Sequence, residues 1–461
     1  MATIERGKAG TGSVLSLDAI GKQDTFLTSN NNQDSFFKYE NIRHSDFAMF
    51  ERVRTVQSEK TKYWPFGRSI TVKYKPTEMS DLLANMYLII TLPQLQGETV
   101  NAFYTDKIGR AIIERIEFRV DEFVLETVDS DWNIIHDELY ATIEEKKGLK
   151  NIINGGRDYL PDVTYANSKP IPLIIPLNLF FSRKHAFEST LVEKDYKPYF
   201  PLCSITKQEI KVTITFRPYN FFAVWKSDTD ADSLTVDFFD VVTQEITLSD
   251  QERHFLQQHP FEVVYETVKR NPIIDVNGSE REFKSFLVPG IPVKSIHWFL
   301  RKSRFELLSE DMSNTSNKEN IQHRYLFSED MADYENETKN PIISDAKIYL
   351  NGDQILGFVE DIQNRTKTDS HNFYKFLQSQ KNNLSTPKKN IYTFSFALNP
   401  KESSPTGALD FSTIESEKSF IQCSFMDTVS TSDDFTFYIF FTGYQVVNFA
   451  NGFLAPKYLA Y

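Results

Sequence analysis

The sequence predicts an all-β protein with two consecutive β-sandwich domains, and three observations support this fold class. The chain has 461 residues, which is enough for two domains of the size common among β-sandwiches. It contains 39 Phe and 21 Tyr, and aromatic rings fill the space between two packed sheets well because each ring buries a large area. Similar segments also occur in the same order in both halves, which indicates an internal duplication.

The most regular strand signal of the first half is the segment 209–217. Apolar side chains alternate there with polar ones, and this period of two is typical of a strand with one buried face. The apolar run 172–181 precedes it, and its prolines predict a position at an edge or a turn. Further strands are expected over residues 47–56, 69–75, 86–92 and 113–124.

The second half carries a matching series of strand signals. Residues 392–398 alternate in the same way and lie late in their half, as 209–217 do in the first. The predicted strand 346–350 runs into Asn351-Gly352, a strong signal for a tight turn. Other strands are expected over residues 237–248, 261–267 and 293–300.

A helix signal follows a strand in each half. In the first half Ser130 and Asp131 suit a helix N-terminus, and apolar residues continue at helical spacing to Tyr140. In the second half a similar pattern runs over residues 368–377. We therefore expect a short helix at the edge of each sandwich.

The domain limits follow from breaks in these patterns. We expect an N-terminal arm over residues 1–35, a first sandwich over 36–226 and a second over 233–461, with the boundary in the small acidic stretch 227–232. Residues 144–169 and 309–340 are expected to form long surface loops, the second of them an exposed insertion.

Charge and cysteine content limit the function classes. The formal net charge is -12, so phosphate backbones are repelled and no direct binding of nucleic acid is expected. Residues 1–21 lack the apolar core of a signal peptide, and no apolar run is long enough to span a bilayer. Cys203 and Cys423 are too few for a disulfide framework and are interpreted as small buried side chains in a reducing compartment.

The sequence assigns no catalytic, cofactor-binding or metal-ligating residue, and it implies no cofactor. Its histidines lack the paired spacing that metal sites need, so structural roles are expected for them. Phosphate-binding loops and nucleophile elbows are absent. The acidic segment 228–233 lacks the Gly and Glu of a calcium loop and is interpreted as a solvated linker. The histidines are His44, His136, His185, His254, His259, His297, His323 and His371.

Glycosylation sequons also occur, but the sequence does not decide whether any of them carries sugar. In an Asn-rich and Ser-rich chain most such matches arise by chance, and without secretion the usual machinery does not reach them. They lie at Asn277, Asn314, Asn336, Asn364 and Asn383.

Several short motifs lie across nearly the whole chain. The most specific are the segments 392–398, YTFSFAL, and 405–412, PTGALDFS. Others lie at residues 21–28, 35–38, 113–118, 131–132, 175–183, 292–298 and 346–352. Together they resemble the major capsid protein family of the nucleocytoplasmic large DNA viruses, whose members have a double jelly-roll fold.

This resemblance implies a structural protein rather than an enzyme. Each sandwich is expected to be an eight-stranded jelly roll of two Greek keys. Three chains around a threefold axis would place six similar units in a nearly hexagonal block that tiles an icosahedral shell. The implied location is the virion capsid, with assembly in the host cytoplasm.

The resemblance also implies partners. These are two further copies in a homotrimer, neighbouring capsomers, and penton and minor capsid proteins. The N-terminal arm would lie inside the shell, against minor capsid proteins or an internal membrane. The loops 95–107 and 144–169 and the insertion 309–340 would form an outward tower.

Two other readings remain open from the residues alone. The main alternative is a two-domain β-sandwich module that binds carbohydrate through its loops. A weaker one is a glycan-active enzyme with a pair of carboxylates, although nothing in the sequence singles out one pair. A stable trimer favours the capsid reading, whereas a monomer with measurable sugar binding favours the module.

Overall fold

The structure is a computed structural model, and the helices and strands of its described residues lie in the compact unit Phe47–Tyr461. It describes residues 45–54, 65–74, 80–93, 103–155, 171–183, 199–224, 236, 238–308, 320–321, 323–329, 340–356, 369–402 and 405–457. The expected N-terminal arm, most of the insertion 309–340, the acidic linker 228–233 and the sequons at Asn314, Asn336 and Asn364 lie outside these residues.

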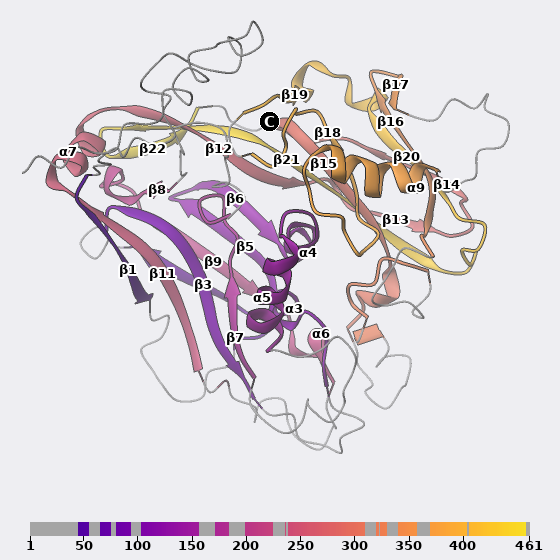
Figure 1. Ribbon diagram of the computed structural model, residues 1–461, viewed down its shortest axis with the longest axis horizontal. Helices are drawn as coiled ribbons and strands as arrows, with labels where there is room; N and C mark the ends of the chain where they lie inside the picture. Colours follow the sequence, from indigo (N-terminus) through magenta and orange to yellow (C-terminus); the bar gives the residue numbers. More distant parts are fainter. Residues whose placement is uncertain are drawn as a thin grey trace, which may run out of the picture. The chain divides into compact units, whose positions relative to one another are not determined.

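The first half of the unit is a sandwich of two antiparallel sheets (Figure 1). One sheet has, in spatial order, β1 (Phe47–Arg54), β11 (Phe238–Leu248), β3 (Leu82–Leu92) and β7 (Ile171–Pro176). The other has β2 (Ser69–Tyr74), β9 (Ile210–Phe216), β5 (Ile113–Val120) and β6 (Phe123–Asp129).

The second half is built in the same way. One sheet has β12 (Phe261–Arg270), β21 (Asp434–Ala450), β15 (Pro292–Lys302) and β18 (Tyr392–Ser395). The other has β14 (Glu282–Phe286), β20 (Phe420–Phe425), β16 (Ile343–Leu350) and β17 (Asp353–Leu356). Short strands extend these sheets or pair beside them: β4 (Phe103–Tyr104), β8 (Phe200–Pro201), β10 (Ala223–Val224), β13 (Ile274–Asn277), β19 (Leu409–Asp410) and β22 (Phe453–Pro456).

The strands are connected in the same order in the two halves. If the strands on the main paths are numbered along the chain within each half, the first sheet has the order 1-8-3-6 and the second the order 2-7-4-5, in both halves. This is the arrangement of a jelly roll, in which the chain alternates between two packed sheets. The expected internal duplication and the double jelly-roll fold are therefore confirmed.

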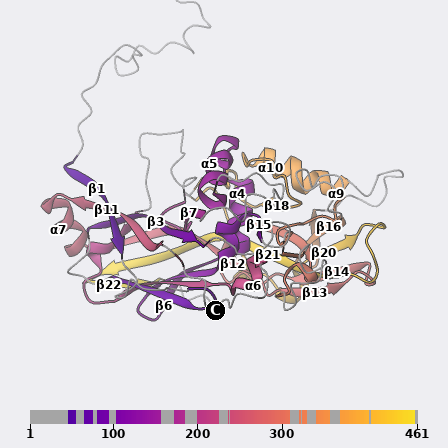
Figure 2. The same ribbon diagram turned by 90° about the horizontal axis from the view of Figure 1, so that it is seen from below.

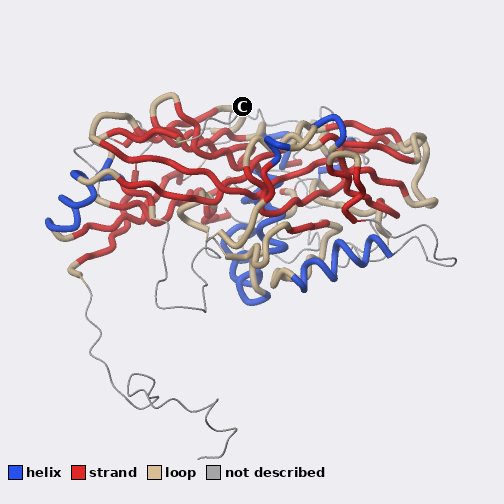
Figure 3. Tube along the Cα trace, turned by 90° about the horizontal axis from the view of Figure 1, so that it is seen from above, coloured by secondary structure: helices blue, strands red, loops and turns tan. Residues whose placement is uncertain are grey.

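The helices repeat as well. In the first half α4 (Ser130–Leu139) follows the fifth main strand, β6, and in the second half a helical segment follows the fifth main strand, β17. That segment consists of α9 (Asp369–Asn372), the π-helical η8 (Phe373–Leu377) and α10 (Gln378–Lys381). Figures 2 and 3 show α5 (Ile143–Asn154) and the α9–α10 segment on the same side of the strand layers.

The other helical elements of the described residues have between three and nine residues. They are α3 (Ile108–Ile112), α6 (Tyr219–Phe222), α7 (Asp250–Gln258), η4 (Leu202–Ser204), η6 (Ser303–Phe305), η9 (Phe411–Thr413) and η10 (Ser416–Lys418). Among them α7 connects the last strand of the first jelly roll to the first strand of the second.

The strand β11 lies in the first jelly roll, whereas the sequence places residues 237–248 in the second. Val242 of β11 pairs with Val53 of β1 on one side and with Tyr87 of β3 on the other. The expected end of the first domain at residue 226 is therefore too early. Sequence order could not reveal this, because the last strand of a jelly roll returns to lie beside the first.

Three other expectations are corrected by local geometry. The segment 113–124 is two strands, because Asp121 takes a left-handed conformation (φ 49°) and turns the chain between β5 and β6. The expected loop 144–169 begins with α5, whose N-terminus carries a capping box of Thr142 and Glu145. The strand expected over 392–398 ends at Ser395, and Leu398 is 90% exposed.

The helical spacing expected over residues 368–377 is only partly right. The segment is helical, but its π-helical turn shifts the buried face, so that Tyr374 is buried and Leu377 is 53% exposed. The tight turn at Asn351-Gly352 is as expected, since both residues have positive φ (54° and 88°) and join β16 to β17.

The described residues of the unit form two apolar cores. The smaller one lies inside the second jelly roll, around Trp298, Phe435 and Phe437. The larger one fills the first jelly roll and continues into the second half, where it includes Tyr265 and Phe440. The two halves therefore share buried surface.

Candidate functional site: the contact between the two jelly rolls

The contact between the jelly rolls is centred on α4 of the first half. Every residue of this helix is buried. Trp132 packs against His297 of β15 and Phe440 of β21, with ring centroids 5.6 Å and 6.1 Å away. The hydroxyl of Tyr140, directly after the helix, lies 3.2 Å from Nε2 of His297. Aromatic side chains thus join the first half to the central strands of the second.

A buried ion pair crosses the same contact. Nη1 of Arg301 in β15 donates to Oδ1 of Asp131 in α4 at 2.8 Å, and both side chains are at most 5% exposed. Burial alone raises the pKa of Asp131, but the guanidinium groups of Arg301 and Arg217 outweigh it and hold this pKa below its usual range. Asp131 is therefore ionised and paired, and Glu306 also accepts a hydrogen bond from Arg301.

A second charged cluster lies deeper in the contact. Arg183 of the first half donates to the carboxylate of Glu126 and, at 3.4 Å, to the backbone oxygen of Glu266 in β12. Glu266 in turn accepts from Lys294 of β15. Burial raises the pKa of Glu126 above its usual value, more than Arg183 lowers it. The cluster balances two carboxyl groups against two cations, which limits the cost of burying them.

The C-terminal end of α4 is tied to the loop after α10. The backbone N–H of Lys388 donates to Oε2 of Glu138 at 3.1 Å, and the N–H of Ser385 donates to the carbonyl of Leu139 at 2.7 Å. Lys107 pairs with the other oxygen of Glu138 at 2.9 Å. Burial has the largest effect on Glu138 and raises its pKa. The charge of Lys107, with those of neighbouring lysines, outweighs burial and lowers this pKa to about 2.

The halves also meet through backbone hydrogen bonds away from α4. The N–H groups of Thr206 and Lys207 both donate to the carbonyl of Gly452 at 3.1 Å. The side chain of Gln208 bonds both polar backbone groups of Leu454, at 3.2 Å and 2.5 Å. Contacts at separate places along the boundary restrain rotation of one jelly roll against the other.

Among the described residues, the histidines and cysteines do not form a metal-binding cluster or a disulfide. No group of three or more His, Cys, Asp or Glu side chains is placed there to bind a metal ion. Burial lowers the pKa of His297 to about 3, with the charge of Lys294 contributing, so the ring is neutral. Cys203 and Cys423 are both free thiols, and Cys423 is buried as expected whereas Cys203 is partly exposed.

The described helices include none that is long and apolar enough to cross a bilayer. Two of the sequons lie in described parts of the chain. Asn277 ends β13 and its amide donates to Asp434, and Asn383 has a positive φ of 56° just after α10.

Sequence reasoning did not identify the charged residues of this contact. Asp131, Arg183 and Arg301 are polar residues in segments whose apolar pattern predicts strand or helix, and pattern alone assigns polar side chains to solvent. The sequence shows only the apolar stripe of α4, which predicts one buried face. The structure buries the polar faces as well, and these therefore need paired polar groups.

The comparisons with known proteins agree with this architecture. Residues 35–249 match the family described as "Major capsid protein N-terminus", and residues 252–455 match "Large eukaryotic DNA virus major capsid protein". The two matches meet just after β11, where the structure ends the first jelly roll.

Curated relatives come from large DNA viruses. Capsid protein 1 of Acanthamoeba polyphaga mimivirus is 22% identical over 316 residues, which are 64% of this chain and 49% of the relative. The major capsid protein of Phaeocystis pouchetii virus is 24% identical over 331 residues, 63% of this chain and 58% of the relative. The chain thus spans about half the length of the curated relatives it matches.

Solved structures share the fold at low identity. The PBCV-1 virus capsid model has a TM-score of 0.69 at 16% identity, with 92% of this chain and 100% of that chain covered. The Faustovirus major capsid protein has a TM-score of 0.64 at 10% identity, with 94% and 96% covered. At these identities the likenesses show the fold alone. The family matches, which together cover residues 35–249 and 252–455, show that the chain belongs to the major capsid protein family of the nucleocytoplasmic large DNA viruses.

Proposed function

We propose that this protein forms a homotrimer that acts as a pseudo-hexagonal capsomer and tiles an icosahedral shell. The observation that carries the proposal is the identical strand order of two jelly rolls in one chain. A threefold axis through three such chains generates six similar units, and a block with six similar corners packs into a hexagonal lattice.

The buried contact between the jelly rolls supports this role. A shell subunit must hold its two jelly rolls in a fixed relative orientation, because a different orientation would change the hexagonal outline of the trimer. Trp132, the Asp131–Arg301 pair and the cluster around Glu266 supply such a restraint, since each is buried between the halves.

The proposed partners are neighbouring capsomers, penton proteins and minor capsid proteins. We place the protein in the virion capsid, assembled in the host cytoplasm. The N-terminal arm is proposed to face an internal membrane or minor proteins, and the insertion 309–340 with the neighbouring loops to form the outward tower; α5 would then be part of that tower. Enzymatic activity and direct binding of nucleic acid are not part of the proposal.

The carbohydrate-binding module is the competing function, and oligomeric mass separates the two. Light scattering on the purified full chain should give about 160 kDa, three times the chain mass of 53.5 kDa. A stable monomer that binds sugars would refute the capsomer and support the module. A trimer that binds no sugar would support the capsomer.

A further inference from the structure

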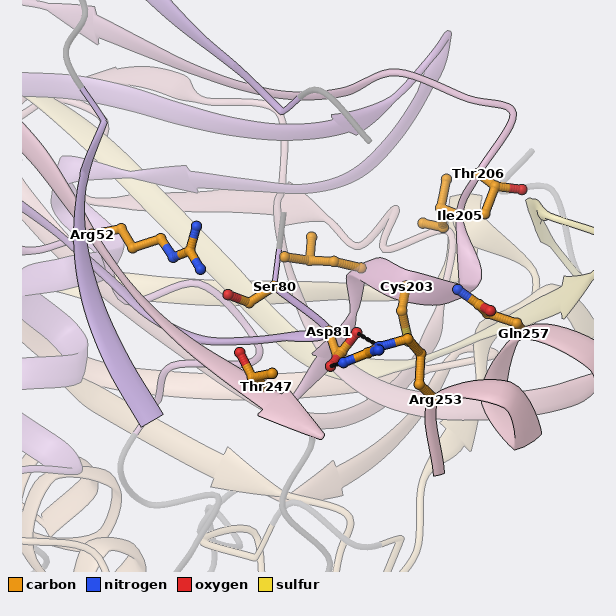
Figure 4. Close-up of a pocket in the computed structure, with 10 residues that line it drawn as sticks. Arg52, Ser80, Asp81, Cys203, Ile205, Thr206, Thr247, Arg253 and Gln257 are labelled. Atoms are coloured by element: carbon orange, nitrogen blue, oxygen red, sulfur yellow. Dashed lines mark hydrogen bonds and ion pairs between the residues drawn. The ribbon is translucent and has the colours of Figure 1, made fainter. Parts of the chain in front are cut away.

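A polar pocket lies at one end of the first jelly roll, and the capsomer proposal does not use it. It has a volume of about 310 Å³ and is formed by β1, the start of β3, β11, η4 and α7. Figure 4 shows the side chains that line it. Those that matter for ligand binding are Arg52, Ser80, Asp81, Thr247 and Arg253.

The carboxylates in and behind the pocket wall are already paired. Asp81 accepts hydrogen bonds from Nε and Nη2 of Arg253 at 2.7 Å and 3.0 Å, and from the N–H of Leu248 at 2.7 Å. Glu245, behind Ser80, accepts from Nη2 of Arg54 at 2.5 Å. Asp81 shares Arg253 with Asp250, which accepts from Nη1 at 2.8 Å but lies outside the lining with an 85% exposed side chain. The lining residues themselves carry one more positive than negative charge.

That additional charge is Arg52. Its nearest carboxylate oxygen is Oε2 of Glu245, 3.7 Å from Nε, which is longer than a hydrogen bond. The side chain is 43% exposed, and its guanidinium points toward Ser80 in Figure 4. The outer nitrogens of a guanidinium form a fork that matches two oxygen atoms of a carboxylate or phosphate.

The hydroxyl of Ser80 is the second sign of a ligand. The residue is only 5% exposed, yet its Oγ has no hydrogen-bond partner among the described residues. A buried hydroxyl without a partner is costly, so such a group calls for an occupant that satisfies it. In Figure 4 this hydroxyl lies between the guanidinium of Arg52 and the side chain of Thr247.

We propose that this pocket binds a small oxyanion of the phosphate or carboxylate class, with Arg52 and Ser80 as its hydrogen-bond donors. A volume of about 310 Å³ lies at the lower end of small-molecule pockets, so it accommodates the anion with at most a small organic group. The surplus charge selects an anion, although the whole chain is acidic.

Occupancy has a structural consequence. Arg52 lies on β1 and Arg253 on α7, the helix that connects the two jelly rolls. An anion in the pocket would neutralise the surplus charge between these elements. Because a ligand that binds only the folded state stabilises that state, saturating anion should raise the unfolding temperature.

Isothermal titration calorimetry on the purified full chain, with inorganic phosphate, sulfate and acetate as probes, tests the proposal. We expect saturable binding of one anion per chain, weakened at least tenfold by Arg52→Gln and severalfold by Ser80→Ala, because each loses a donor to a charged ligand. Arg68→Gln is the matched control: it removes one exposed arginine before β2, outside the pocket lining, and should bind as the wild type does.

The outcomes are separable. Phosphate binding without acetate binding identifies the phosphate class, and the reverse identifies the carboxylate class; either supports the site. The proposal is overturned if the wild type shows no saturable anion binding. It is also overturned if the two single variants, Ser80→Ala and Arg52→Gln, both bind the anion with unchanged affinity. If circular dichroism shows that the Arg52→Gln variant does not fold, the anion affinity of the Ser80→Ala variant decides whether the proposal stands.

Discussion

Asp131 and Arg301 meet across the contact between the jelly rolls, and their pairing is a testable source of stability. We expect Asp131→Ala to lower the free energy of unfolding by about 3 kcal/mol, because it leaves the buried guanidinium of Arg301 without its main partner. This is the lower end of the usual range, since Glu306 still pairs with Arg301 at 2.9 Å. Urea denaturation measures the change.

An exposed ion pair provides the control for that measurement. Lys147 and Glu144 of α5 lie 3.3 Å apart with side chains 70% and 80% exposed. Lys147→Ala should change the free energy of unfolding by less than about 0.5 kcal/mol, because solvent screens such pairs. Equal effects of the two substitutions would show that the Asp131–Arg301 pair does not hold the halves together.

His297 predicts how stability depends on pH. Its pKa falls from 6.5 to about 3 in the folded protein, first because of burial and then because of Lys294. The folded pKa is the lower one, so this contribution to stability is fully present above pH 6.5 and is lost as the pH falls toward 3. Each pH unit in that window costs about 1.4 kcal/mol.

The variant His297→Gln isolates this effect. Between pH 7 and pH 5 the wild type should lose about 2 kcal/mol more of its unfolding free energy than His297→Gln does. Urea denaturation at both pH values gives the two losses, with His254→Gln, a change at an exposed histidine, as control. Parallel losses in the wild type and His297→Gln would contradict a buried neutral ring at this position.

At the scale of elements, the central strand β21 depends on a glycine. A Cβ at Gly443 would lie 2.1 Å from the carbonyl oxygen of Pro292 and 2.7 Å from Cδ1 of Ile291. We expect Gly443→Ala to lower the free energy of unfolding by about 2 kcal/mol or more, because the obstacle is backbone in a well-packed sheet. Denaturant midpoints of the purified variants test this.

Gly148→Ala is the control for Gly443→Ala, because it adds the same methyl group where no other atom is close. Gly148 lies in the interior of α5, and nothing is within 4 Å of a Cβ there. The same added methyl group should stabilise the protein by about 0.5 to 1 kcal/mol, because Gly is unfavourable in a helix. If both glycines tolerated alanine equally, the close approach of β15 and β21 at Gly443 would be wrong.

The elements also show how far sequence patterns reach. Period-two alternation located β9 and β16, because each buries one face against a core. It failed at β18, where the alternation continues to Leu398 but strand pairing with β15 stops at Ser395. It also could not assign β11 to a half, since pairing partners far apart in the chain leave no local signal.

The ion pairs between the two halves could not be predicted from the sequence for a related reason. Arg183 and Glu266 lie in different jelly rolls, and the sequence shows no period that would link them. Their burial depends on the packing of both halves. The repeated order of strand and helix signals predicted the duplication, and the family resemblance predicted the double jelly-roll fold, whereas the ion pairs between the halves required coordinates.

At the scale of the whole molecule, the shared core predicts cooperative unfolding. The larger core includes Phe118 of the first jelly roll and Phe440 of the second. Either half alone would expose this surface, so we expect one thermal transition, with the van't Hoff enthalpy equal to the calorimetric one. Two resolved transitions in calorimetry would show that the jelly rolls unfold as independent domains.

Two equivalent jelly rolls in one chain, repeated by a threefold axis, should form a six-cornered block. Electron microscopy of the purified protein tests this most directly. We expect particles with a hexagonal outline, in which threefold averaging resolves six similar lobes. Particles of two lobes, or trimers whose averaged image lacks six similar lobes, would contradict it.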